Sequence, residues 1–309
     1  MSPTGSMRLD DPRGVLYAAL AYVAWGLVTI YWKLLGSVPS SEVLAHRIVW
    51  CLGLLIIVIG IMGRARHVLH LLRKPKIVGL MVLTAFLIGG NWYLFIWAVV
   101  EGRVLETSLG YYINPLVSIL LGALLLGERL SRLRKIAFAL AATAVAIQII
   151  MLGELPWVSL TLAFSFGAYG YLRKVAPVEA LEGLFIETLV LAPLAVAWLM
   201  WVAQNGTMAF GAQDMAIDLL LIGAGPVTAV PLLLFSLGAR MVRLSTMGFL
   251  QYIAPTISFL LAVYVWHEPF GPVRAATFAL IWAALALVSW EAVANERRFR
   301  ARRAVANPD

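Results

Sequence analysis

Long apolar runs alternate with short polar segments along the whole chain. Each run is too long for a strand and could cross about 30 Å of hydrocarbon as a helix, which satisfies its own backbone hydrogen bonds inside a bilayer. The pattern therefore predicts an all-α integral membrane protein with ten transmembrane helices. The predicted spans are residues 14–36, 42–63, 77–99, 107–126, 136–152, 156–172, 181–203, 217–238, 247–266 and 273–291.

One stretch of the chain occurs twice, and the two copies align without a gap. Tyr112 to Glu128 reads YINPLVSILLGALLLGE, and Tyr252 to Glu268 reads YIAPTISFLLAVYVWHE. Leucine-rich runs align easily by chance, but Tyr, Pro and Glu in the same register indicate a duplicated unit. Because each unit holds five predicted spans, an odd number, the second unit must enter the membrane from the opposite side. The sequence thus predicts two inverted five-helix repeats.

Basic residues predict the orientation of these spans. Most of the 24 Lys and Arg residues lie in segments on the same side as the N-terminus, whereas only Arg103 and Arg274 lie in the opposite loops. The positive-inside rule then places both termini in the cytoplasm. The predicted units are a cytoplasmic tail, 1–13, the first repeat, 14–152, the second repeat, 153–291, and a basic cytoplasmic tail, 292–309.

Composition excludes several other classes of protein. The chain is 62% hydrophobic, with a mean hydropathy of +0.89, far above a soluble domain. Its single cysteine, Cys51, excludes an intrachain disulfide. We find no phosphate loop, no paired Cys/His metal set and no nucleophile with a base, so no cofactor, metal or catalytic residue is predicted. The basic segments lack the interleaved aromatics that bind nucleic acid.

Helix breakers and polar residues gather in the third, fourth, eighth and ninth predicted spans. These spans contain Gly89-Gly90, Pro115, Pro226, Pro231 and Pro255, which fit broken or bent helices around a cavity or ordinary kinks made for packing. An amide that faced lipid would be costly, so the amides face protein or water, and structural interhelical hydrogen bonding is an equal alternative. Some of the aromatics could belong to the interfacial belt instead. The candidate cavity and substrate-binding residues are Asn91, Trp92, Tyr111, Tyr112, Asn114, Gln251 and Tyr252.

Charged residues inside the spans form two further candidate groups. Glu187 is the deepest acid, and it could couple transport to protons or form a buried pair with Arg173 or Lys174. Lys33, His46 and Arg47 could form an outer vestibule that attracts anions, although Lys33 could equally extend to the interface.

Two glutamates, Glu128 and Glu268, end equivalent spans on opposite sides of the membrane. Because of this separation, we expect them to cap loops or to pair with nearby bases rather than to share one chemical role. Small residues in the fifth and tenth spans permit close helix approach, so we expect these spans to be packing elements rather than pore walls.

Six segments carry a resemblance to a known family: AYVAWGLVTIYWKLL, EVLAHRIVW, LIGGNWYLFIWAV, ETSLGYYINPLVSILLGALLLGERL, LAFSFGAYGYLRK and LSTMGFLQYIAPTISFLLAV. They closely resemble RarD proteins, which are EamA-type members of the drug/metabolite transporter superfamily. The resemblance extends from Gly14 to about Glu291 and implies ten helices, inverted repeats and cytoplasmic ends. It implies no catalytic residue and no particular substrate.

The leading functional hypothesis is a secondary transporter of the bacterial inner membrane that moves a small organic metabolite or drug, outward, by alternating access. The alternatives are a membrane receptor or scaffold without transport, and an integral-membrane enzyme. The expected partners are a small-molecule solute and the lipid bilayer, without nucleic acid. Monomer and homodimer both fit the sequence.

Overall fold

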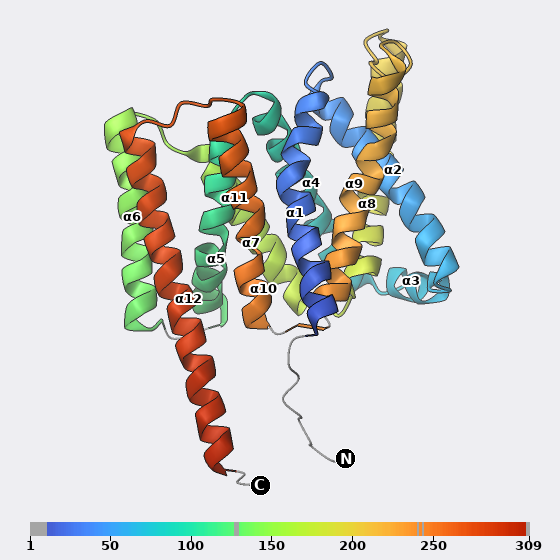
Figure 1. The fold of residues 1–309 in the computed structure, drawn as a ribbon. Coiled ribbons are helices and arrows are strands. Elements are labelled where there is room, and N and C mark those ends of the chain that lie inside the picture. Colours follow the sequence, from blue (N-terminus) through green and yellow to red (C-terminus); the bar gives the residue numbers. More distant parts are fainter. Residues whose placement is uncertain (1–10, 127–129, 240, 243, 307–309) are drawn as a thin grey trace.

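The computed structural model describes residues 11–126, 130–239, 241–242 and 244–306, and the long elements in these ranges are all helices (Figure 1). Each of the ten predicted spans is helical over most of its length. The elements are α1 (Pro12–Leu34), α2 (Ser40–Ile61), α3 (Ala65–Leu72), α4 (Pro75–Val100), α5 (Val104–Leu126), α6 (Arg132–Leu152), α7 (Trp157–Val175), α8 (Ala180–Gln204), α9 (Met215–Ala239), α10 (Leu244–Leu250), α11 (Ile253–Leu260), the π-helix η1 (Leu261–Val265) and α12 (Pro272–Ala306).

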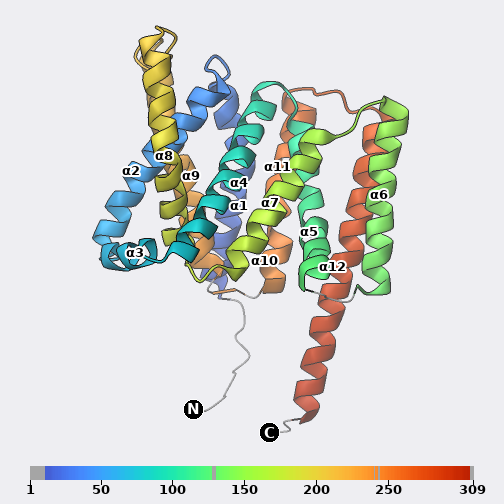
Figure 2. The same cartoon turned by 180° about the vertical axis from the view of Figure 1, so that it is seen from behind.

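Nine segments within the described ranges are long and apolar enough to cross a membrane, which confirms an all-α membrane protein. One of the nine, Thr246–Val265, combines α10, α11 and η1. The remaining predicted span is α7, which has 19 residues and carries Ser, Thr, Tyr, Arg and Lys side chains that lower its hydropathy. It nevertheless lies inside the bundle, packed against α4 and α5 (Figure 2).

The helices form one elongated bundle (Figures 1 and 2). At one edge, α6 and α12, which both carry small residues that permit close approach, pack on each other. At the opposite edge, α2 packs on both α8 and α9. Between the edges, α1 packs on α9 and α11, and α7 packs on α4 and α5. The interior is therefore built from contacts between helices that are distant in sequence.

The last helix is longer than a bilayer requires. Its 35 residues correspond to about 52 Å at 1.5 Å per residue. The C-terminal part of α12 extends beyond the bundle, on the side where α1 begins (Figure 1). The basic tail that begins at residue 292 thus continues the helix as far as Ala306.

Helix α3 was not predicted from the apolar pattern, because it is too short to span a membrane. It lies in the basic segment between the second and third spans and packs on α4 and α8. Its two buried residues, Val68 and Leu71, face this contact, while most of its other residues are exposed. An amphipathic helix of this kind fits the boundary between a helix bundle and water.

The two copies of the repeated stretch differ in shape. In the first copy, Pro115 lies in the interior of α5, which nevertheless continues without interruption. In the second copy, the helix breaks at Gln251 and Tyr252, and Pro255 is the third residue of α11. A proline in a first turn removes no intrahelical hydrogen bond. Helix α9 continues through its two prolines, so among the predicted proline-containing spans in the described ranges only the ninth is broken.

Candidate functional site

All seven candidate cavity residues are buried or partly buried. Asn91 on α4 is 2% exposed, and its Nδ2 donates hydrogen bonds to the carbonyl of Leu162 (3.1 Å) and to Oγ of Ser165 (2.9 Å), both on α7. This is the interhelical bonding that the sequence allowed as an alternative to a role in solute binding. Its side-chain oxygen has no partner among the described residues. Asn91 therefore joins α4 to α7 and keeps one buried acceptor.

Equivalent tyrosines from the two copies of the repeated stretch meet in the structure. The rings of Tyr112 and Tyr252 stack with 6.4 Å between centroids, and the Tyr112 hydroxyl lies 2.7 Å from Oγ1 of Thr256. Both contacts connect α5 to the interrupted span. At the break, Nε2 of Gln251 donates to the Gly248 carbonyl (2.9 Å) of the preceding helix, α10. The break thus lies against a buried aromatic contact.

Arg47 on α2 lies between two tryptophans. Its guanidinium carbon is 4.1 Å from the ring centroid of Trp92 on α4 and 5.2 Å from that of Trp32 on α1. Arg47 is 8% exposed, so these contacts are almost completely desolvated. Cation–π contacts are strongest under such conditions.

Further aromatic rings contact one another in the interior of the bundle. Tyr111 on α5 contacts Phe95 (5.6 Å between centroids) and Phe166 (6.0 Å) edge-on. Phe166 in turn lies 5.9 Å from Tyr169 on α7. Asn114 is partly buried one helical turn beyond Tyr111, and its side-chain oxygen has no partner in the described part of the chain. The bundle interior therefore offers flat amphipathic surfaces, which suit organic solutes.

Glu187 on α8 is fully buried and pairs with Arg173 rather than with Lys174. Its Oε1 lies 3.8 Å from Nε of Arg173, and its Oε2 accepts a hydrogen bond of 3.2 Å from the Tyr169 hydroxyl. Lys174, the next residue on α7, is exposed. Arg173 also donates to the carbonyl of Glu179 (3.0 Å), so it has a second partner. The structural pairing predicted for Glu187 is present, and its part in coupling stays a prediction.

The three candidates for an outer vestibule have different neighbours. Lys33 donates to the carbonyl of Val100 (3.3 Å) and lies 5.8 Å from the Trp266 ring centroid. His46 and Arg47 point to different neighbours although they are adjacent in sequence. His46 accepts a hydrogen bond from Trp50 (3.2 Å) and lies 3.9 Å from Glu42, whereas Arg47 faces Trp32 and Trp92.

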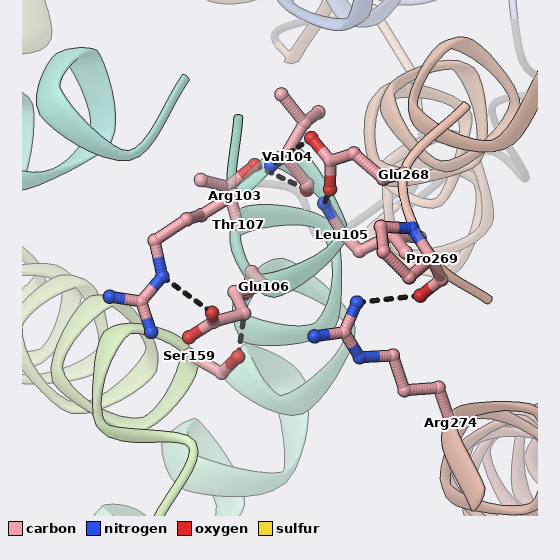
Figure 3. Close-up of polar contacts among 9 residues, drawn as sticks. All are labelled: Arg103, Val104, Leu105, Glu106, Thr107, Ser159, Glu268, Pro269 and Arg274. Atoms are coloured by element: carbon pink, nitrogen blue, oxygen red, sulfur yellow. Dashed lines mark hydrogen bonds and ion pairs between the residues drawn. The ribbon is translucent and has the colours of Figure 1, made fainter. Parts of the chain in front are cut away.

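Glu268 caps a helix from the other half of the chain (Figure 3). Its carboxylate accepts hydrogen bonds from the first backbone N–H groups of α5, those of Val104 (2.7 Å) and Leu105 (2.8 Å). His267 has a φ of 52°, and this turn at the end of η1 brings the following carboxylate into position. Burial raises the pKa of Glu268, while the two N–H bonds and the cations Lys33 and Arg274 oppose that rise. Glu128, the equivalent residue, lies outside the described residues.

Two further buried carboxylates bridge the halves, and one of them, Glu182, was not among the predicted site residues. Glu42 on α2 accepts hydrogen bonds from the backbone N–H groups of Ala209 (2.8 Å) and Phe210 (3.1 Å). Glu182 on α8 pairs with Arg64 at 2.5 Å. A hydrogen bond to Glu179 and the charge of Glu182 raise the pKa of Arg64.

The spacing of Glu42 and Glu182 in the sequence indicates that they are equivalent residues. Glu42 and Glu182 are separated by the same interval as the repeated tyrosines, Tyr112 and Tyr252. Both glutamate side chains are fully buried near the start of the second helix of their half. By their contacts, Glu42 links α2 to the segment before α9, and Glu182 links α8 to the residue before α3. Within the described residues, no three His, Cys, Asp or Glu side chains are placed to hold a metal ion.

Glu268→Ala is expected to lower the free energy of unfolding by about 1–2 kcal/mol, because it leaves the first N–H groups of α5 without an acceptor. Denaturation in mixed micelles measures this change. Glu268→Gln is the matched control, since the amide oxygen still accepts a hydrogen bond and the loss should be smaller. Equal stability of the alanine variant and the wild type would contradict the role as a cap.

Comparison with known proteins gives the family of the chain. Residues 12–150 match the EamA-like transporter family. Two similar relatives are an uncharacterized transporter of Vibrio cholerae, 47% identical over 91% of this chain and 93% of the relative, and protein RarD of Escherichia coli, 45% identical over 93% and 97%. A protein of known crystal structure shares the fold, with a TM-score of 0.58 at 20% identity, over 89% of this chain and 96% of the other.

The relatives span almost the full length of the chain, and the apolar helices agree with a multi-pass membrane protein. The names of several relatives describe transporters, which implies a bilayer environment and a small-molecule solute. The chain therefore belongs to the RarD group of EamA-like proteins, transporters of the drug/metabolite type.

Proposed function

We propose that this chain is a secondary transporter of the bacterial inner membrane that exports a small organic solute by alternating access between two inverted repeats, residues 14–152 and 153–291. The observation that carries the proposal is the reciprocal packing of the two halves. In the first half, α1 packs on α9 and α11; in the second, α7, the counterpart of α1, packs on α4 and α5, the counterparts of α9 and of the interrupted span. Such reciprocity is expected when inverted repeats enclose a shared path for the solute.

The distribution of basic residues supports cytoplasmic termini. The start of α1, helix α3, the start of α6 and the end of α12 lie on one side of the bundle (Figures 1 and 2). The sequence segments that contain or adjoin these elements, 1–13, 64–76, 129–135 and 292–309, hold 16 of the 24 Arg and Lys residues. The positive-inside rule assigns this side to the cytoplasm.

Reconstituted protein is expected to move at least one solute of a panel of small acids, amines and neutral metabolites across a liposome membrane. Radiolabelled flux with and without an imposed proton gradient tests the transport and its coupling. Protein-free liposomes give the passive leak, which is subtracted. An absence of protein-dependent flux for every member of the panel would favour a receptor or scaffold.

A reporter that is active only in the periplasm should stay silent when it is fused after Arg303. The same reporter fused to a chain truncated after Glu101 should be active, because Glu101 follows α4 at the opposite side of the bundle. Enzyme activity of the two fusions in whole cells measures the orientation. Activity of the Arg303 fusion would reverse the proposed topology.

A further inference from the structure

We infer that Arg47 is an anion-binding residue of the solute site and that the transported solute carries a carboxylate or a similar oxyanion beside an apolar body. This inference rests on the proposed transport function and names the class of solute. The cation lies well inside its helix. Arg47 is the eighth residue of α2, so it lies about 10 Å along the helix from its outer end.

The described part of the chain supplies no counter-ion for the charge of Arg47. Ion pairs in the described residues join other groups, and none includes Arg47. Its Nε and the nearby indole nitrogen of Trp32 are buried, and neither has a hydrogen-bond partner in the part of the chain that the structure describes. A buried charge without a counter-ion is costly, and ionisable residues in membranes usually pair or serve transport.

The repeat shows how unusual this position is. Arg47 and Glu187 occupy matching positions in the register of the repeat, and each is the eighth residue of the second helix of its half. Glu187 is paired with Arg173 on α7. The first helices of the two halves match at an offset of 141, where Gly26 corresponds to Gly167, so the counterpart of Arg173 is Trp32. In the first half, the corresponding residues are therefore Arg47 and Trp32, which lie together but include no carboxylate. Where the second half has an ion pair, the described residues of the first half supply a cation without a counter-ion.

The neighbours of Arg47 suit an organic anion rather than an inorganic one. Trp32 and Trp92 flank the guanidinium. A guanidinium binds a carboxylate through two parallel hydrogen bonds while its faces remain stacked on aromatic rings. The tryptophan surfaces can then contact the apolar part of the same solute.

The test compares carboxylates with their neutral amides. N-acetylphenylalanine and N-acetyl-leucine, each with its amide, are the probes for proteoliposome flux and for thermal stabilisation of the detergent-purified protein. Wild-type protein should carry the acids in preference to the amides and be stabilised more by the acids. Arg47→Gln should reduce protein-dependent flux of the acids by about ten- to a hundredfold and amide flux by a much smaller factor, so that the preference for the acids is lost.

Two further variants keep the test decisive. Arg47→Lys retains the charge but loses the planar fork, so acid flux should fall to an intermediate level. Arg66→Gln, a change of the same charge at an exposed position of α3, should behave as wild type. If neither Arg47 variant folds, equal stabilisation of the wild type by acids and amides overturns the inference.

The possible failures are distinguishable. No protein-dependent flux of any member of the wider panel overturns the transport function together with this inference. Transport of the panel with equal flux of acids and amides, or acid flux that does not change in Arg47→Gln, overturns the inference alone.

Discussion

Glu187→Ala is expected to lower the free energy of unfolding by about 3–5 kcal/mol, the usual cost of removing one partner of a buried ion pair. The change leaves the Arg173 guanidinium, whose side chain is only 14% exposed, without its carboxylate. It also removes the acceptor of the Tyr169 hydroxyl. The carbonyl of Glu179 remains for Arg173, but a carbonyl does not neutralise the charge. Denaturation in mixed micelles measures the loss.

Two related variants separate this structural role from a role in coupling. Glu187→Gln keeps the shape and the acceptor for Tyr169, so it should fold, and proton-driven flux should disappear if the carboxylate carries the coupling proton. Arg173→Ala/Glu187→Ala should be less destabilised than the sum of the single changes, because neither charge is left alone. Undiminished proton-driven flux in Glu187→Gln would eliminate the coupling role, and additive losses would eliminate the pair.

Gly225→Ala is expected to cost about 1–3 kcal/mol of stability, because α9 and α2 approach each other too closely for a side chain. A Cβ at this position would lie 2.5 Å from the carbonyl carbon of Trp50 and 2.8 Å from the amide nitrogen of Cys51. Both atoms belong to the backbone of α2, so the contact cannot be relieved by a change of rotamer. The two helices must move apart, and thermal unfolding in detergent should report the change as a lower melting temperature.

Gly53→Ala is the matched control for this packing prediction. Gly53 also lies inside a transmembrane helix, but a Cβ there meets no atom within 4 Å. Alanine favours the helix by up to about 1 kcal/mol relative to glycine, so this variant should be as stable as the wild type or more stable. If both variants lost the same stability, the cost would come from the backbone rather than from the α2–α9 contact.

The apolar pattern was sufficient to predict the spans, because hydrophobic length is a local property of the sequence. The second span, predicted at 42–63, is the helix Ser40–Ile61. The register of the repeat also places Arg47 and Glu187 at equivalent positions before any contact is known. The pattern does not specify how each helix is rotated about its own axis within the bundle. Arg173 and Lys174 are adjacent in sequence but about 100° apart around α7, so packing alone decides which of them meets Glu187.

Contacts between distant segments were the least predictable part of the candidate site. The role of Trp32 beside Arg47 depends on how α1 crosses α2 and α4, which hydropathy does not specify. The same holds for Glu268, because the N–H groups that donate to it lie at the start of α5, in the other half of the chain. A carboxylate at the end of a span indicated a cap, but the identity of the capped helix required the folded chain.

One molecule holds two conformations of nearly the same sequence motif. Around Pro115 the motif is a continuous helix, and around Pro255 it is two shorter helices joined at Gln251 and Tyr252. If the halves exchange conformations during transport, the state that opens to the other side of the membrane would have a jointed α5 and a straight ninth span. The broken conformation of the second copy would then show the conformation that the first copy adopts in that state. In each transport cycle the helix break would alternate between the two copies.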